Sequence, residues 1–207
     1  MSNNKKFNNS SQWIHNHIND FYVKYSYKNK LRSRSWFKLK EIDKKNNIFK
    51  SGMKVIDLGS FPGGWSKYVI SKVGFKGLVI AVDKKFMNVI KGVNFIQGDI
   101  NKKDILNKIL SFKKKIHVLI SDMSPNISGI KFVDDIKIIK LIKISLNISK
   151  KVLLKKGIFI VKAFQGIKLD YYIKKIKLFF LKVYLYKPNS SRSSSREIYI
   201  IAISKKK

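Results

Sequence analysis

Short apolar segments alternate with stretches of helical periodicity through most of this 207-residue chain, and that alternation constrains its fold more than any other feature. Strands that alternate with helices form a mostly parallel sheet that is covered on both faces. The pattern therefore predicts an α/β fold of the Rossmann-like class. The first five strands are expected at residues 53–58, 77–82, 93–97, 116–121 and 158–161.

Two further strands are expected near residues 182–186 and 197–203, with only a Ser-rich segment between them. Because no helix separates this pair, we expect an antiparallel hairpin at the end of a seven-stranded sheet. Asp104 is expected to cap one helix, and Asp134 or Asp135 to open another. The expected helices cover residues 13–27, 36–46, 64–73, 104–110, 134–154 and 171–180.

The charge of the chain narrows its possible partners. Lys and Arg number 45 against 12 Asp and Glu, which gives a formal net charge of +33. Such a surface attracts polyanions through the release of their counterions, so a nucleic acid is the favoured partner. A membrane surface, or a composition set by A/T-rich codons, are the alternatives. The lysines are spread along the chain and do not mark the binding face.

Several classes of protein do not fit the sequence. No apolar run approaches the roughly 18 residues that a membrane span needs, and no secretory signal follows the first lysines. The absence of cysteine rules out disulfides and thiolate metal sites, and we expect a monomeric cytoplasmic protein without metal. Residues 1–28 are expected to form a basic N-terminal extension, a tail and a helix, and residues 29–207 a single domain.

Four aspartates stand at or just after the ends of successive predicted strands, namely Asp57, Asp83, Asp99 and Asp122. Ligands of open parallel sheets bind beyond the carboxyl ends of the strands. Aspartate is also a common turn residue, but four at successive strand ends indicate a site. Asp83 is placed to accept hydrogen bonds from two ribose hydroxyls, and Asp99 from an adenine amino group.

A glycine-rich loop, Asp57-Leu58-Gly59-Ser60-Phe61-Pro62-Gly63-Gly64-Trp65-Ser66, joins the first strand to a helix. Glycines let the backbone approach a ligand closely, although an ordinary strand-to-helix turn also contains them. The spacing G-x-G-x-x-G, which seats a pyrophosphate, is absent. Acidic strand ends around such a loop suit a nucleoside with a cationic tail, and S-adenosylmethionine is a ligand of this kind.

Four ionisable residues lie in distinctive local strings. Lys38 ends Ser-Arg-Ser-Trp-Phe-Lys, Asp122 begins Asp-Met-Ser-Pro-Asn, Lys162 precedes Ala-Phe-Gln-Gly, and Glu197 follows a Ser/Arg-rich run. Together with the glycine loop, these strings resemble the FtsJ heat-shock methyltransferase family over about residues 11–204. The chain departs from this family at the loop residue Phe61, where small side chains are usual.

The resemblance implies an S-adenosylmethionine-dependent methyltransferase fold and a catalytic domain over residues 29–207. It also implies an activity, the 2′-O-methylation of a uridine ribose in 23S rRNA within the large ribosomal subunit. The catalytic tetrad of the family falls on Lys38, Asp122, Lys162 and Glu197. Its cofactor-binding positions fall on Gly63, Trp65, Asp83, Asp99 and Asp122.

Elementary chemistry agrees with this assignment. A ribose hydroxyl attacks a methyl group only as its proton leaves, and a lysine accepts that proton only when it is neutral. We expect Lys162, at the end of a buried strand, to be the base, and Lys38 to be a neighbouring cation that lowers the pKa of Lys162. Asp122 and Glu197 are expected to orient the two lysines, although carboxylates act on the pKa in the opposite direction.

Six basic residues flank the predicted site and are candidates for contacts with RNA phosphates. They are Lys28, Lys30, Arg32, Arg34, Arg192 and Arg196. Two other functions remain as alternatives. One is a non-catalytic assembly factor that binds ribosomal RNA through the same fold, which an intact tetrad disfavours. The other is a nicotinamide-dependent oxidoreductase, which the missing G-x-G-x-x-G disfavours.

Overall fold

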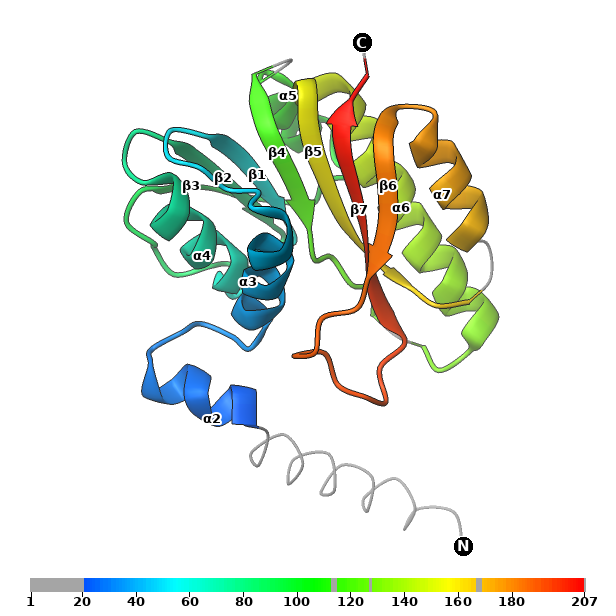
Figure 1. Ribbon diagram of the computed structural model, residues 1–207, viewed down its shortest axis with the longest axis horizontal. Helices are drawn as coiled ribbons and strands as arrows, with labels where there is room; N and C mark the ends of the chain where they lie inside the picture. Colours follow the sequence, from blue (N-terminus) through cyan, green and yellow to red (C-terminus); the bar gives the residue numbers. More distant parts are fainter. Residues whose placement is uncertain (1–20, 113–114, 127, 167–168, 207) are drawn as a thin grey trace, which may run out of the picture.

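The computed structural model describes residues 21–112, 115–126, 128–166 and 169–206. A single seven-stranded sheet runs through the molecule in the order β3-β2-β1-β4-β5-β7-β6, with helices on both of its faces (Figure 1). The predicted α/β class and the seven-stranded, mostly parallel sheet are therefore confirmed. The predicted tail and the first part of the helix expected from residue 13 lie outside the described residues.

The first five strands are all parallel and lie side by side in the order β3-β2-β1-β4-β5. Their centres are rich in Val, Ile and Leu that are almost completely buried, as strands covered on both faces require. All their carboxyl ends therefore meet at one edge of the sheet. These strands are β1 (Lys54–Leu58), β2 (Leu78–Asp83), β3 (Val93–Gln97), β4 (Ile116–Ser121) and β5 (Leu153–Phe164).

The predicted hairpin is confirmed, with β7 (Glu197–Lys205) antiparallel to both of its neighbours, β5 and β6 (Phe180–Tyr186). The last strand is thus inserted between β5 and β6, which leaves β6 at the edge of the sheet. Because β7 runs against β5, its first residues lie beside the last residues of β5. This register pairs Lys162 with Tyr199 and Phe164 with Glu197.

The helices cover the two faces unequally. On one face α3 and α4 bury Leu39, Ile42 and Val69 against the sheet, and on the other α5, α6 and α7 pack over the remaining strands (Figure 1). A short helix, α2, precedes α3. The bounds are α2 (Phe21–Lys28), α3 (Ser35–Asn46), α4 (Gly64–Val73), α5 (Lys103–Leu110), α6 (Lys131–Val152) and α7 (Leu169–Lys177). No described helix is long and apolar enough to cross a membrane.

Two helix starts differ from the prediction. The long helix α6 begins at Lys131, and Asp134 lies in its first turn. The carboxylate of Asp134 accepts hydrogen bonds from the backbone N–H groups of Ser128 (2.8 Å) and Gly129 (3.1 Å), so it fastens the preceding loop. Asp104 likewise lies in the first turn of α5 and is not its cap. In both places the acid is stabilised by the positive end of the helix dipole.

The start of β5 was also predicted too late. The helix α6 ends at Val152, and the strand begins at the next residue, Leu153. Gly157, which was expected in a turn, lies inside the strand, where a Cβ atom would come within 2.9 Å of the carbonyl oxygen of Leu154. A glycine therefore allows close backbone packing at this position, which sequence reasoning read as a turn signal.

Candidate active site and cofactor cavity

A cavity of about 560 Å³ lies at the carboxyl edge of the parallel strands. It is lined by residues that follow β1, β2, β3 and β4, and by one side of α6. Three of the predicted aspartates, Asp83, Asp99 and Asp122, line this cavity together with Gly59 and Phe61. Four lysines that the sequence analysis did not single out also line it: Lys84, Lys85, Lys137 and Lys140.

The two aspartates predicted to bind a nucleoside are held by hydrogen bonds from their own loops. Asp83 accepts backbone N–H bonds from Phe61 to Oδ2 (3.0 Å) and from Lys85 to Oδ1 (2.8 Å), which ties the glycine loop to the end of β2. Asp99 accepts bonds from the backbone and the side chain of Asn101, both to Oδ1. These bonds lower the pKa of Asp99, so its carboxylate is charged at neutral pH.

Asp57, the first of the four strand-end aspartates, does not line the cavity. It is completely buried behind the glycine loop, where Oδ2 accepts a hydrogen bond of 2.6 Å from the hydroxyl of Ser66. Its other oxygen, Oδ1, has no hydrogen-bond partner. Burial raises the pKa of Asp57 to about 7, and the nearby carboxylates of Asp122 and Asp83 add to the effect of burial. Asp57 therefore joins β1 to α4 beneath the site.

The glycine loop passes very close to the segment that follows β4. Gly59 has a φ of 77°, and a Cβ atom there would lie 2.5 Å from the side chain and 3.0 Å from the Cα atom of Met123. Gly63 also has a positive φ, at the N-terminus of α4. Side chains other than hydrogen are thus excluded at Gly59, and the loop forms the floor of the cavity.

Gly63 and Trp65, both predicted to bind the cofactor, are not among the residues that line the cavity. The Trp65 ring is buried, and its centroid lies 5.6 Å from that of Tyr199. Its indole N–H donates a hydrogen bond of 2.8 Å to the carbonyl oxygen of Ser35. The side chain of Trp65 therefore belongs to the core between α3, α4 and the sheet, and it locks the start of α4 to α3.

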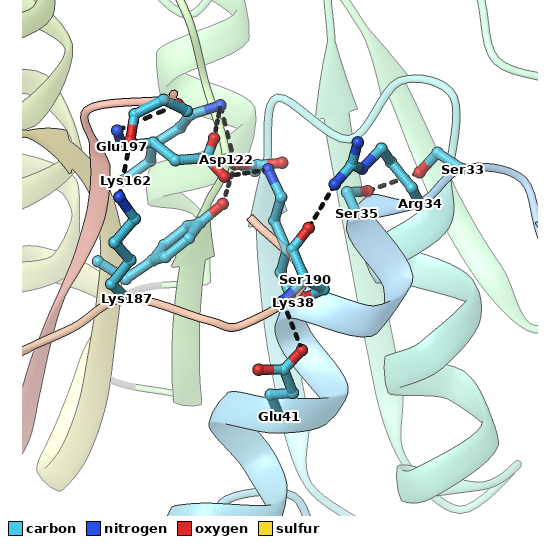
Figure 2. A network of polar contacts seen from close by, with 12 residues as sticks. Ser33, Arg34, Ser35, Lys38, Glu41, Asp122, Lys162, Lys187, Ser190 and Glu197 are labelled. Atoms are coloured by element: carbon cyan, nitrogen blue, oxygen red, sulfur yellow. Dashed lines mark hydrogen bonds and ion pairs between the residues drawn. The ribbon is translucent and has the colours of Figure 1, made fainter. Parts of the chain in front are cut away.

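The four predicted catalytic residues come together from four elements (Figure 2). Lys38 Nζ lies 2.5 Å from Glu197 Oε1, and Lys162 Nζ lies 3.3 Å from Asp122 Oδ1 and 3.5 Å from Glu197 Oε2. Lys38 comes from α3, Asp122 follows β4, Lys162 is in β5 and Glu197 begins β7. The antiparallel register of β5 and β7 brings Glu197 to the carboxyl edge, where α3 covers the sheet.

The electrostatics of the tetrad reverse one expectation from the sequence. Burial tends to lower the pKa of Lys162, but the carboxylates of Asp122 and Glu197 outweigh it and raise that pKa above 10.5. Burial tends to raise the pKa of Glu197, but the ammonium groups of Lys38 and Lys162 outweigh it and lower that pKa to about 2. The expected depression of the Lys162 pKa by Lys38 is therefore wrong for the free protein, because Lys38 is paired with Glu197.

Sequence reasoning missed Tyr199 as a member of this cluster. Its hydroxyl donates a hydrogen bond of 2.8 Å to Asp122 Oδ1, the same oxygen that faces Lys162. The ring is fully buried and lies beside Lys162 across the β5–β7 ladder. A signal for it was present, because residues two apart on a strand share a face, and Tyr199 is two residues beyond Glu197.

Two of the six basic residues predicted to contact RNA are bonded within the protein. The Arg32 guanidinium donates to the carbonyl oxygens of Asn88 (2.7 Å) and Val89 (2.6 Å), and so holds the loop after β2. The Arg34 guanidinium donates to the carbonyl oxygen of Ser190 and lies 5.8 Å from the centroid of the Tyr22 ring. Both arginines therefore organise loops around the site.

The other four basic residues are placed differently. Lys28, at the end of α2, and Lys30 are exposed, and so is Arg196, which immediately precedes β7. Arg192 is half-buried in the loop between β6 and β7. Their role in RNA binding stays a prediction. Among the described residues, no group of three or more His, Asp or Glu side chains is arranged to hold a metal ion.

Comparison with known proteins gives these features a family. Residues 31–205 match the model of the FtsJ-like methyltransferase family. A protein named ribosomal RNA large subunit methyltransferase E from Wigglesworthia glossinidia brevipalpis is 49% identical over 197 residues, which is 95% of this chain and 97% of that protein. A protein of the same name from Buchnera aphidicola (strain Sg) is 47% identical over 98% of this chain and 99% of its own length.

Solved structures agree with this fold. A crystal structure described as a putative ribosomal RNA methyltransferase from Plasmodium falciparum superposes with a TM-score of 0.72 at 29% identity, covering 84% of this chain and 98% of that chain. An O-methyltransferase from Thermotoga maritima superposes with a TM-score of 0.56 at 16% identity, over 81% of this chain and 64% of that chain, and supports the fold alone. The chain belongs to the FtsJ-like methyltransferase family.

Proposed function

We propose that this protein transfers a methyl group from S-adenosylmethionine to the ribose 2′-hydroxyl of a uridine in 23S rRNA of the large ribosomal subunit. The observation that carries the proposal is the double role of Asp122. Its side chain lines the cavity, and its Oδ1 faces the Lys162 ammonium at 3.3 Å. A methyl donor in the cavity and a base at Lys162 therefore share one carboxylate, so the reacting groups are neighbours.

The cavity suits this donor chemically. S-adenosylmethionine supplies a methyl group bonded to a sulfonium cation, beside a nucleoside and an amino-acid group. Asp83 and Asp99 offer charged or hydrogen-bonding oxygens to ribose hydroxyls and an adenine amino group, and Asp122 offers negative charge near the cation. Lys137 and Lys140 on α6 offer cations to a carboxylate. This mixed lining fits a zwitterionic nucleoside better than it fits a pyrophosphate.

Lys162 is the proposed base, and its environment decides when it acts. In the free protein its amine holds a proton, because two carboxylates face it. Lys162 releases that proton more readily when a further cation is bound beside it and RNA covers the site, since like charge and burial both lower the pKa of an amine. The neutral amine then accepts the proton of the ribose hydroxyl as the methyl group is transferred.

The remaining members of the tetrad are proposed to orient the base. Glu197 contacts both amines, and its pKa of about 2 keeps it charged throughout the physiological range. Lys38 fixes one oxygen of Glu197, which leaves the other directed at Lys162. Tyr199 fixes Asp122 in the same way from below. The amine of Lys162 is thereby held at a defined place beside the cavity.

RNA is the proposed substrate because only RNA carries the 2′-hydroxyl that this reaction needs. The net charge of +33 supplies the attraction to phosphates, and the names of the relatives point to large-subunit ribosomal RNA. We propose that Lys28, Lys30, Arg192 and Arg196 contact phosphates. The basic extension over residues 1–28 would add to this contact, beside a catalytic domain over residues 29–207 of a monomeric cytoplasmic enzyme.

The test is to map ribose methylation on ribosomal RNA from cells with and without this protein. A 2′-O-methyl group on a single 23S uridine that is present only with the protein is expected. Lys162→Ala is expected to keep the fold and the affinity for S-adenosylmethionine but to lose turnover. Lys155→Ala, which changes an exposed lysine of the same strand, is the matched control and should keep full activity.

Two results would contradict the proposal. Large subunits that lack the protein but carry an unchanged methylation pattern, and that accept no label from purified protein and labelled donor, would favour the non-catalytic assembly factor. Full turnover by Lys162→Ala would remove that residue from the reaction while leaving the methyltransferase activity itself in place.

A further inference from the structure

The loop between β6 and β7, residues 187–196, is fastened to α3 by side chains from successive turns of that helix. Arg34, which caps α3, Lys38 and Glu41 are spaced i, i+4 and i+7, so they form one stripe along the helix. Lys38 is the member that belongs to the tetrad. The two flanking members contact the loop at a point seven residues before Glu197 (Figure 2).

The contacts converge on the backbone of Ser190. The carboxylate of Glu41 accepts the backbone N–H of Asn189 at Oε2 (2.7 Å) and that of Ser190 at Oε1 (3.0 Å). The Arg34 guanidinium donates to the carbonyl oxygen of Ser190 at 2.5 Å. Ser190 is fully buried, so its N–H and its carbonyl oxygen are both held by α3 and not by water.

Two features of Glu41 indicate a specific task. The chain contains only two glutamates, Glu41 and Glu197, and both of them bind at this loop. In a chain of charge +33 a carboxylate has many ammonium groups to pair with, yet Glu41 binds two backbone N–H groups. Two converging donors need two acceptor oxygens on one group, which a carboxylate provides and an amide does not.

We propose that Glu41, assisted by Arg34, is a positioning residue that holds the loop in the conformation in which Glu197 reaches both Lys38 and Lys162. Glu197 is the residue at which the loop returns to the sheet, so a loop released at Ser190 gains freedom where the tetrad needs a fixed carboxylate. This inference rests on the proposed methyltransferase function, and it assigns to α3 the placement of two tetrad members.

The experiment measures kcat and KM for methyl transfer to large ribosomal subunits by Glu41→Gln, with Asp104→Asn as the control. Asp104 is an exposed acid of α5, so its replacement changes the net charge by the same amount. We expect kcat of Glu41→Gln to fall about ten-fold, equivalent to about 1.4 kcal/mol of barrier. Its KM for S-adenosylmethionine should stay within two-fold of the wild-type value, and the control should match wild type.

A double variant tests whether Glu41 acts through Glu197. If it does, Glu41→Gln combined with Glu197→Gln is no slower than Glu197→Gln alone, whereas independent effects multiply. Hydrogen exchange gives a readout apart from activity. The amides of residues 189 and 190 should exchange faster in Glu41→Gln, while those of β5 and β7 stay protected. Glu41→Asp, which keeps the charge but is shorter, should recover part of both effects.

Two results overturn the inference. One is a Glu41→Gln enzyme with wild-type kcat despite faster exchange at residues 189 and 190, and the other is a double variant in which the two losses multiply. If Glu41→Gln does not fold, Arg34→Lys decides: a lowered kcat at unchanged KM for the donor supports positioning, and a wild-type kcat refutes it. Failure of the proposed function is distinct, because then neither wild type nor Asp104→Asn transfers methyl groups.

Discussion

Replacing Asp57 by asparagine should remove a pH-dependent cost from the stability of this protein. The Asp57 carboxyl group is fully buried, accepts one hydrogen bond from Ser66, and has an oxygen without a partner. Its pKa is raised to about 7, mainly by burial. Asparagine has the same shape and still offers an oxygen to Ser66, but it carries no charge at any pH.

The size of the effect follows from the two pKa values of Asp57. Its ordinary pKa is 3.8 and its folded-state pKa is about 7, so the unfolded chain releases this proton first as the pH rises. Between those values the folded state binds the extra proton, and its stability falls by about 1.4 kcal/mol per pH unit. From pH 5 to pH 8 the loss amounts to roughly 2.5 kcal/mol, and above pH 8 it is nearly constant.

The assay is urea unfolding of wild type and Asp57→Asn, followed by far-ultraviolet circular dichroism at several pH values from 5 to 9. Other titrating groups are common to both proteins, so they cancel in the difference between the two free energies of unfolding. We expect the variant to gain on the wild type by roughly 2.5 kcal/mol from pH 5 to pH 8. Curves that stay parallel over this range would refute the reasoning, because the buried carboxyl group would then titrate alike in both states.

Three further changes test the site. Tyr199→Phe removes the donor to Asp122 but keeps the ring, so turnover should fall while the free energy of unfolding drops by only about 1 kcal/mol in urea titrations. Glu197→Gln removes a charge that raises the Lys162 pKa, so the rising limb of the pH–rate profile should move to lower pH. Gly59→Ala collides with the methionine after Asp122, so calorimetry should show weaker S-adenosylmethionine binding; unchanged affinity would contradict a tight floor.

The alternating pattern predicted the sheet well because parallel strands buried on both faces read as apolar runs. Strand 93–97 and helix 64–73 agree with β3 and α4 residue for residue. The errors lie where one residue type has two uses. Asp134 reads as the opening of a helix, yet in the structure it fastens a loop from within the first turn. Gly157 reads as a turn, yet it sits in a tightly packed strand.

The site was predictable to the level of residue identity but not to the level of electrostatics. The four tetrad residues are recognisable in their local strings, and the structure brings them together. The sign of the Lys162 pKa shift was not predictable, because it depends on which partner Lys38 meets. Lys38 meets Glu197, and the two carboxylates then dominate at Lys162. Only the distances between charges decide such a balance.

The distribution of acids explains how one strongly basic chain can bind both a cation and a polyanion. The chain has only 12 acidic residues, yet Asp83, Asp99 and Asp122 all line one cavity. Within the tetrad two ammonium groups face two carboxylates, so the cluster adds no net charge to repel a cationic donor. Attraction between exposed charges and phosphates reaches about 10 Å in salt, whereas contacts inside the cavity act over a few ångströms. The excess of lysine can therefore draw RNA to the surface, while the strand-end carboxylates keep the cavity favourable for a positive charge.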